Sequence, residues 1–182
     1  NAINKGFRMA TGDIIDWLNA DGCYYPNAPN TAAKAFQRIG GLDLFYGDAV
    51  FVNENSEFLR YFVEVQDFNA EVLLDYSDYI MQPTTFFRRD TAEKLGFLRE
   101  DLHYGMDWDF WCRLAKERAR CHYEKKLIAS NRVYDATKTL SGGSNRSREL
   151  MQINLEHKTG LIPWGGLSYW AGEILRNSTS KL

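Results

Sequence analysis

The sequence predicts an α/β protein in which a mixed sheet is flanked by helices. Helix-like and strand-like segments alternate along the chain, and the apolar strand-like segments are too short for a β-sandwich. The 182 residues are 45% hydrophobic and 14% aromatic, which is enough to bury one sizeable core.

The predicted elements follow from hydrophobic periodicity and from the positions of Gly and Pro. Helices are predicted over residues 2–10, 26–39, 70–76, 90–95, 107–119 and 147–157. Strands are predicted over residues 14–18, 44–52, 82–89 and 127–134. Residues 58–68 fit either a strand or a helix, residues 141–145 fit a flexible loop, and residues 162–175 are Trp-rich and only weakly periodic.

Local chemistry predicts where several helices begin and end. Pro26 suits the first turn of a helix, because that turn does not need its missing N–H. Asp90 with Glu93 has the spacing of a capping box. Gly12 and Gly96 each follow a helical segment, where glycine commonly ends a helix.

Charge and cysteine content exclude some classes of protein. The 22 basic and 24 acidic residues nearly balance, so no nucleic-acid-binding surface is expected. Cys23, Cys112 and Cys121 lack the spacing of a zinc site and are expected to be free thiols in a reducing compartment, which predicts a cytoplasmic location. No apolar run approaches the roughly 20 residues of a membrane span.

The first candidate site is Asn19-Ala20-Asp21-Gly22, directly after the predicted strand at 14–18. A carboxylate at the C-terminal end of a buried strand faces the crevice in which open α/β sheets bind ligands. Divalent Mg²⁺ and Mn²⁺ prefer hard oxygen ligands, and Asn19 offers a second oxygen beside Asp21. The tetrapeptide therefore predicts a metal and diphosphate site, with an ordinary polar turn as the alternative.

The second candidate site is the start of the helix predicted over residues 107–119. Asp107 and Asp109 lie on either side of Trp108 there. Acids in a first helical turn complement the helix dipole, and Asp109 is the one expected to cap the helix. Asp107, with Trp108 and Trp111 beside it, is the candidate for a desolvated general base.

The segments around Asn19–Gly22, Gln82-Pro83, Asp107 and Arg132 occur in an order that resembles family 2 glycosyltransferases, which have the GT-A fold. The resemblance covers roughly residues 1–149. It implies a GT-A-like mixed sheet over residues 1–149 and a C-terminal helical extension over residues 150–182. Only one strand is predicted before Asp21, whereas a nucleotide-binding α/β half contains further βαβ units. We therefore expect an N-terminally truncated domain.

The resemblance also implies a function. A sugar would move, with inversion, from a nucleotide-diphosphate sugar to a hydroxyl acceptor, in the synthesis of a glycan or a cell-surface polysaccharide. Asn19 and Asp21 would hold the donor, Asp21 would also bind Mn²⁺ or Mg²⁺, and Asp107 would be the catalytic base.

Four more residues receive supporting roles from the resemblance. Gln82, Trp108 and Asp109 would lie on the acceptor side or support it, with the Gln82 amide available to a sugar hydroxyl. Arg132 would offer positive charge to the diphosphate. The partners would be the nucleotide sugar and a carbohydrate or other hydroxyl acceptor, and a cytoplasmic protein of this kind can associate peripherally with the inner face of the membrane.

Three positions depart from the family pattern. Gly22, Met106 and Tyr134 stand where relatives carry an Asp, a Glu and a His, and the first and last of these changes bring metal dependence into question. Two alternatives follow: a noncatalytic or degenerate sugar- or nucleotide-binding remnant, and a truncated product that cannot bind donor. Aromatic residues such as Trp108 and Trp164 can stack on sugars, although core packing is the ordinary role of such residues.

Overall fold

The computed structural model describes residues 2–134 and 142–179, with side chains described as far as residue 174. The described chain divides into two units. The sheet unit contains residues 2–68, 79–98 and 117–134, and the helical unit contains residues 69–78, 99–116 and 142–179. The predicted α/β class, with a mixed sheet and flanking helices, is confirmed.

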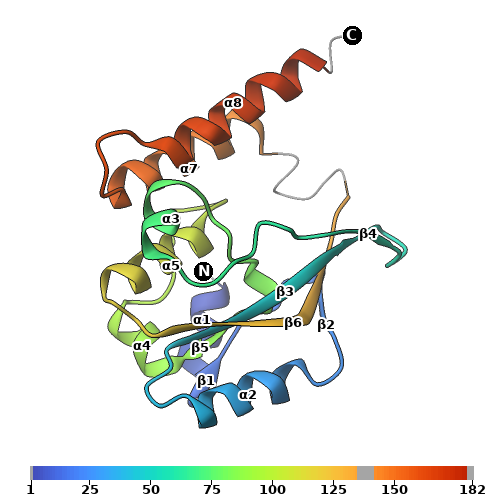
Figure 1. Cartoon of the computed structure of the whole chain (residues 1–182), viewed down its shortest axis with the longest axis vertical. Coiled ribbons are helices and arrows are strands. Elements are labelled where there is room, and N and C mark those ends of the chain that lie inside the picture. Colours follow the sequence, from blue (N-terminus) through green and yellow to red (C-terminus); the bar gives the residue numbers. More distant parts are fainter. Residues whose placement is uncertain (1, 135–141, 180–182) are drawn as a thin grey trace. The chain divides into compact units, whose positions relative to one another are not determined.

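The sheet unit is built on one mixed sheet. Its strands are β1 (Ile14–Ile15), β2 (Gly22–Tyr24), β3 (Leu44–Val52), β4 (Phe58–Tyr61), β5 (Phe86–Arg88) and β6 (Cys121–Arg132). The strand order is β1-β5-β3-β6-β2, and β4 pairs with the end of β3. The long strands β3 and β6 run parallel and side by side (Figure 1), whereas the other pairs are antiparallel.

Two helices cover opposite faces of this sheet. They are α1 (Ala2–Met9) and α2 (Ala28–Arg38). Successive residues of a strand point to opposite faces of its sheet. In β5, Phe86 belongs to a core cluster that contains residues of α2, whereas the ring of the next residue, Phe87, lies 5.6 Å from the Phe7 ring of α1. The remaining short helices of this unit are the 3₁₀ helix η1 (Gln82–Thr84) and α4 (Arg89–Lys94).

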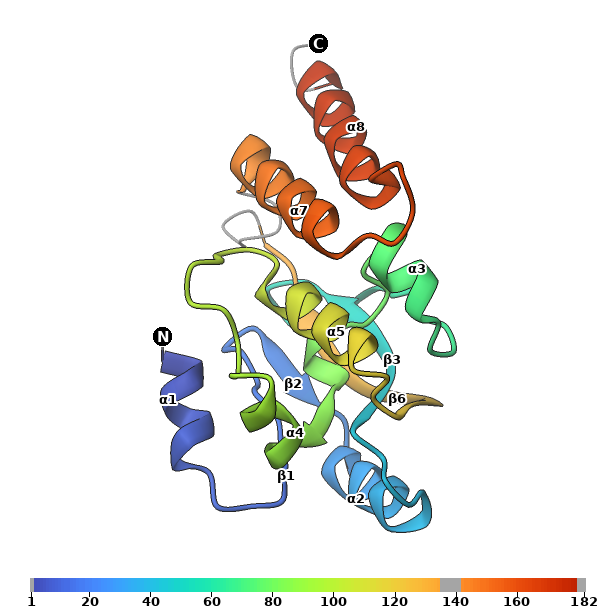
Figure 2. The same ribbon diagram turned by 90° about the vertical axis from the view of Figure 1, so that its left-hand side faces the viewer.

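The helical unit contains α3 (Ala70–Asp75), α5 (Met106–Lys116), α7 (Gly143–His157) and α8 (Trp164–Thr179). Helices α7 and α8 lie side by side (Figure 2). The buried Asn154 of α7 joins three helices: its Nδ2 donates to Leu74 O at 2.8 Å, and its Oδ1 accepts the N–H of Gly166 at 2.9 Å. Within the described residues, no helix is both long and apolar enough to cross a bilayer.

The predicted strand over residues 14–18 is wrong beyond Ile15. Strand β1 is only two residues long, because its partner β5 offers only a short edge and the carbonyl of Trp17 accepts the side-chain N–H of Gln82 instead of a ladder bond. Asp21 therefore does not lie at the end of that strand. It lies in the turn that leads into β2, a strand that the sequence did not predict.

Other boundaries also differ from the predictions. Helix α2 begins after Asn27, whose φ of 66° is left-handed, so Pro29 and not Pro26 lies in its first turn. Residues 82–84 form η1 instead of a strand, because the hydroxyl groups of Thr84 and Thr85 bond back to Met81 O and Gln82 O.

The predicted capping box at Asp90 is wrong as well. Helix α4 begins at Arg89, and Glu93 pairs with Arg89 at 2.7 Å instead of reaching back to the cap. The Asp90 carboxylate accepts the N–H of the next residue, Thr91, at 2.8 Å.

Further along the chain, α5 ends at Lys116 and not at residue 119, because Arg118 has a φ of 55° and β6 begins at Cys121. Residues 58–61 of the ambiguous segment are strand β4. Helix α7 begins at Gly143, inside the predicted loop at 141–145, of which residue 141 lies outside the described residues. The predicted domain boundary between residues 149 and 150 falls within α7 and stays a prediction.

Candidate functional site

The turn at residues 19–22 carries the candidate donor site. The N–H of Gly22 donates to Asn19 O at 2.9 Å, which closes the turn, and the N–H of Arg132 donates to Asp21 O at 2.8 Å, which ties the turn to the end of β6. Asn19 is exposed and Asp21 is half-buried. The two residues thus lie on one turn whose backbone is held from two directions.

Gln82 fixes the other side of this turn. Its side chain is 6% exposed, its Nε2 donates to Trp17 O, and its Oε1 accepts from Asn19 Nδ2 at 3.2 Å. Both ends of the buried amide thus make a hydrogen bond within the protein, and a contact between this amide and a sugar hydroxyl stays a prediction. Gln82 is a positioning residue for the Asn19–Asp21 turn.

Replacing Gln82 by Ala is expected to lower the free energy of unfolding by about 1–3 kcal/mol, because a buried amide and its hydrogen bonds are removed. The control is Gln37→Ala, on the exposed face of α2, with an expected change within about 0.5 kcal/mol. Urea unfolding of both variants measures the difference. Equal midpoints for the two variants would show that the Gln82 bridge does not hold the turn.

Arg132, whose backbone N–H bonds to this turn, has a side-chain donor that no described residue uses. Its Nη2 lies 3.1 Å from Ser56 Oγ, while its Nε is buried and makes no hydrogen bond within the described residues. A buried guanidinium N–H without an acceptor is costly unless a ligand supplies one. The predicted neighbour Lys138 lies outside the described residues.

The residues of the turn carry the kind of oxygen atoms that a divalent cation prefers. Asp21 offers carboxylate oxygens, and Asn19 offers the amide oxygen that its bond to Gln82 leaves unused. Mg²⁺ is commonly held by one or two such hard oxygen ligands together with phosphate oxygens. The set is small for a protein-only metal site, so a cation here would need further oxygen ligands from a bound molecule.

Asp16 also lies near the start of this turn. It lines a cavity of about 410 Å³ whose other walls are mostly apolar residues of α1 and the β1 region, including Phe7 and Trp17. Burial raises the pKa of the Asp16 carboxyl to about 6. No local pattern points to this property, since Asp16 is one acid within an apolar run.

In the helical unit, Asp107 lies at the start of α5 as predicted. Its Oδ1 accepts the N–H of Trp108 at 2.9 Å, and part of the residue remains accessible to solvent. Burial raises the pKa of this carboxyl, and the nearby charge of Glu149 acts in the same direction, while the N–H of Trp108 and the charge of Arg146 oppose them. A raised pKa is the property that a general base near neutral pH requires.

Glu149 of α7 supports the segment before Asp107. Its carboxylate accepts the backbone N–H groups of His103, Tyr104 and Gly105 at 2.9, 2.6 and 2.8 Å. These three hydrogen bonds to one carboxylate hold residues 103–105, the segment directly before α5, in place. Sequence reasoning missed this residue, because nothing local links Glu149 to a loop more than 40 positions away.

The prediction that Asp109 caps α5 is wrong, because its carboxylate binds side chains instead. Asp109 is 1% exposed, its Oδ1 accepts from His157 Nε2 at 2.9 Å, and its Oδ2 accepts from Arg113 Nε at 2.8 Å. Arg99 Nη1 lies 3.5 Å from Oδ1. Although burial raises the pKa of Asp109, the hydrogen bond of His157 and the charge and hydrogen bond of Arg113 bring it below its usual value.

The Asp109 cluster is an ion-pair network. Asp109, Glu156 and His157 lie close enough to share a cation, yet Arg99 and Arg113 already neutralise the carboxylates. The Asp109–Arg113 pair has a four-residue helical spacing, so it was visible in the sequence. The His157 contact was not, because it crosses between helices.

Trp108 is part of the core of the helical unit. It is 1% exposed, its Nε1 donates to Leu73 O at 2.9 Å, and its ring lies 5.6 Å from that of Tyr169. Such a side chain has no free face for an acceptor. Trp108 and Asp109 are thus both too buried to contact an acceptor, and a supporting role for them stays a prediction.

The chain is similar in sequence to curated bacterial proteins named glycosyltransferases. The predicted resemblance to glycosyltransferases is therefore confirmed. No family model matches the chain. The uncharacterized glycosyltransferase YwdF of Bacillus subtilis (strain 168) is 27% identical over 172 residues, which cover 89% of this chain and 61% of YwdF. The uncharacterized glycosyltransferase RP339 of Rickettsia prowazekii (strain Madrid E) is 23% identical over 150 residues, or 76% of this chain and 45% of RP339. The chain thus spans about half the length of these relatives.

The fold is similar to that of solved structures of S. aureus TarS. The crystal structure of TarS 1-349 superposes with a TM-score of 0.56, covering 88% of this chain and 45% of that chain. A second TarS crystal structure gives a TM-score of 0.57, with 89% and 28% covered. Sequence identity is 13% in both cases, so this likeness concerns the fold alone.

Proposed function

We propose that the chain is part of an inverting glycosyltransferase of family 2, with a GT-A fold, that uses a nucleotide-diphosphate sugar as donor. The observation that carries the proposal is the turn with Asn19 and Asp21, held by Gln82 on one side and bound to the backbone of Arg132 on the other. The similarity to proteins named glycosyltransferases supports it. Glycan or cell-surface polysaccharide synthesis and a cytoplasmic location at the membrane face are part of the same proposal.

The proposed reaction is a single displacement at the anomeric carbon. The acceptor hydroxyl oxygen forms the new bond to that carbon, while the bond from the carbon to the diphosphate oxygen breaks and the nucleoside diphosphate leaves with the electron pair. Asp107 takes the proton of the hydroxyl, for which its raised pKa suits it.

The residues of the turn and β6 would stabilise the departing diphosphate. Arg132 offers its unused Nε–H to a phosphate oxygen, and a charge-assisted bond of this kind strengthens as negative charge develops on the leaving group. Asp21 and Asn19 would hold Mg²⁺ or Mn²⁺, which when bound would neutralise part of the same charge.

Titration calorimetry of the protein with UDP, GDP and dTDP, each with and without Mn²⁺, tests the donor site. We expect at least one of the three to bind, and Asp21→Asn to weaken binding with Mn²⁺ by about tenfold or more. Asp13→Asn, at an exposed acid between α1 and β1, is the control and should bind as the native protein does.

Two results would contradict the proposed glycosyltransferase activity of this chain. Absence of binding for all three nucleotides would remove the donor site from this chain and would favour the truncated product that cannot bind donor. Binding that is the same with and without Mn²⁺ and unaffected by Asp21→Asn would favour the noncatalytic remnant, to which the departures at Gly22, Met106 and Tyr134 point.

A further inference from the structure

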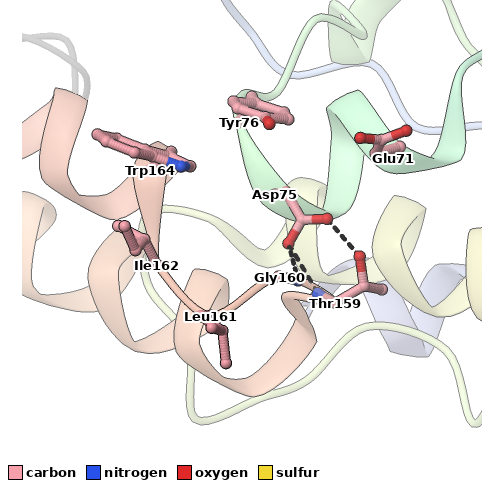
Figure 3. Close-up of a pocket in the computed structure, with 8 residues that line it drawn as sticks. All are labelled: Glu71, Asp75, Tyr76, Thr159, Gly160, Leu161, Ile162 and Trp164. Atoms are coloured by element: carbon pink, nitrogen blue, oxygen red, sulfur yellow. Dashed lines mark hydrogen bonds between the residues drawn. The ribbon is translucent and has the colours of Figure 1, made fainter.

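The helical unit contains a cavity of about 320 Å³ that the proposed reaction does not use. It lies between α3 and the segment that joins α7 to α8 (Figure 3). The Tyr76 and Trp164 rings line it, and these residues are 46% and 50% exposed. The Glu71 carboxylate lies on the same cavity (Figure 3).

The wall opposite α3 is held rigidly. The buried Asp75 carboxylate accepts the N–H groups of Thr159 and Gly160 at 2.7 and 2.9 Å, and also the Thr159 hydroxyl (Figure 3). The Lys158 ammonium donates to the carbonyls of Gly160 and Leu161 at 2.7 and 3.0 Å. The segment therefore keeps its shape without a ligand.

A close backbone approach sets the spacing of the two aromatic residues. Gly165 packs directly on the end of α3, where an added Cβ would lie 2.7 Å from Tyr76 O. Only a residue without a side chain allows this contact, and the contact places Trp164, the preceding residue, beside Tyr76. The two half-exposed rings are thus held as parts of one preformed surface.

We propose that this cavity is a binding subsite for a neutral sugar unit of a glycan. A pyranose ring presents C–H groups on its faces, which pack on the aromatic faces of Trp164 and Tyr76, and hydroxyl groups at its rim, which donate to the Glu71 carboxylate. The volume is at the small end of the roughly 300–1,000 Å³ of ligand pockets, which suits one or two sugar rings.

The charges of the cavity exclude two other occupants. The exposed Glu71 carboxylate places negative charge on it, which opposes a phosphate, an acidic sugar or an anionic lipid surface, whereas the charge of Asp75 is balanced by Lys158 and by its own hydrogen bonds. An entirely apolar partner would bury the Glu71 carboxylate without a hydrogen-bond donor, at a large cost.

Saturation-transfer NMR and calorimetry with chitotetraose, cellotetraose, maltotetraose and the acidic tetragalacturonate test the subsite. At least one neutral tetrasaccharide should bind, and Trp164→Ala should weaken its binding by about tenfold or more, while Trp164→Phe should retain most of it. Tyr61→Ala is the control, since Tyr61 is 61% exposed in the sheet unit and outside the cavity. Tetragalacturonate should not bind to the native chain.

The inference fails if none of the neutral tetrasaccharides binds at about 10 mM, or if Trp164→Ala binds as well as Tyr61→Ala does. Equal binding of tetragalacturonate would also overturn it. Trp164 is half-exposed, so the variant should fold, and an unchanged thermal melt checks this. Because the assay contains no donor nucleotide, its failure would leave the proposed glycosyl transfer untouched.

Discussion

Replacing Asp107 by Asn is expected to lower kcat for sugar transfer by about 10²–10⁴-fold, the usual contribution of a positioned general base. Asparagine keeps the shape of the side chain and an oxygen that can accept the N–H of Trp108, so the start of α5 should persist. The measurement is the rate of nucleoside diphosphate release that depends on acceptor, using the donor whose nucleotide binds.

Asp90→Asn is the matched control. Asp90 also lies in a first helical turn and accepts the N–H of the following residue, at 2.8 Å from Thr91, but it lies on the exposed surface of α4. It should transfer sugar at the native rate. Equal activity of Asp107→Asn and Asp90→Asn would show that Asp107 is not the base.

The pH profile gives a second test of Asp107. The base acts only when it is deprotonated, so activity should fall as the pH drops through the pKa of Asp107. Burial raises that pKa, and the acid limb of kcat/KM should therefore lie above the ordinary Asp value of about 3.9. An acid limb at or below the ordinary value would contradict the desolvated environment.

Replacing Asp109 by Ala is expected to lower the free energy of unfolding by about 3–5 kcal/mol, because a buried charge network loses its central carboxylate. Arg113 loses its partner at 2.8 Å, His157 loses its partner at 2.9 Å, and Arg99 remains close to both without the negative charge between them. Chemical unfolding followed by circular dichroism measures the loss.

Asp101→Ala provides the control for this prediction. Asp101 also pairs with Arg99, at 2.6 Å, but its side chain is 64% exposed, and surface pairs contribute about 0–1 kcal/mol. A loss for Asp109→Ala no greater than that for Asp101→Ala would show that the buried network is not a main source of stability.

The stability lost in Asp109→Ala should depend on pH. The folded-state pKa of Asp109 is lower than usual, so its contribution is fully present above the unfolded-state pKa of about 3.9 and is lost as the pH falls through the folded-state pKa. The difference between Asp109→Ala and the native protein should thus be constant near neutral pH and shrink only in acid. A difference that shrinks already between pH 7 and pH 5 would contradict this cause.

Much of the fold was predictable from local pattern. The helical periodicity of Phe110, Trp111 and Leu114 predicted the buried face of α5, and these side chains are 0% exposed. The apolar segment at 44–52, interrupted only by Gly47-Asp48, predicted the central strand β3 with the same bounds. Both signals are strong because burial along one face imposes a regular spacing on the sequence itself.

The candidate site was only partly predictable. The order of motifs identified Asn19, Asp21 and Asp107 as candidates, but it placed Asp21 at the end of a strand that in fact ends at Ile15. The place of Asp21 depends on the hydrogen bonds of Gln82 with Trp17 and Asn19, and on the bond from the Arg132 N–H to Asp21 O. In each case the partner is more than 60 positions away in the sequence. No local spacing encodes such partners.

The sequence by itself determined the α/β class, the main buried faces and the acids that can carry chemistry, because these depend on composition, periodicity and short motifs. Only the tertiary structure decided what each polar or aromatic side chain does. The side chains of Gln82 and Asp109 are buried and hydrogen-bonded within the protein. Of the tryptophans, Trp108 is 1% exposed, whereas Trp164 is 50% exposed and lines a cavity. The physical reason is that the role of a side chain depends on its partners and its contact with water, and packing sets both between segments far apart in the chain.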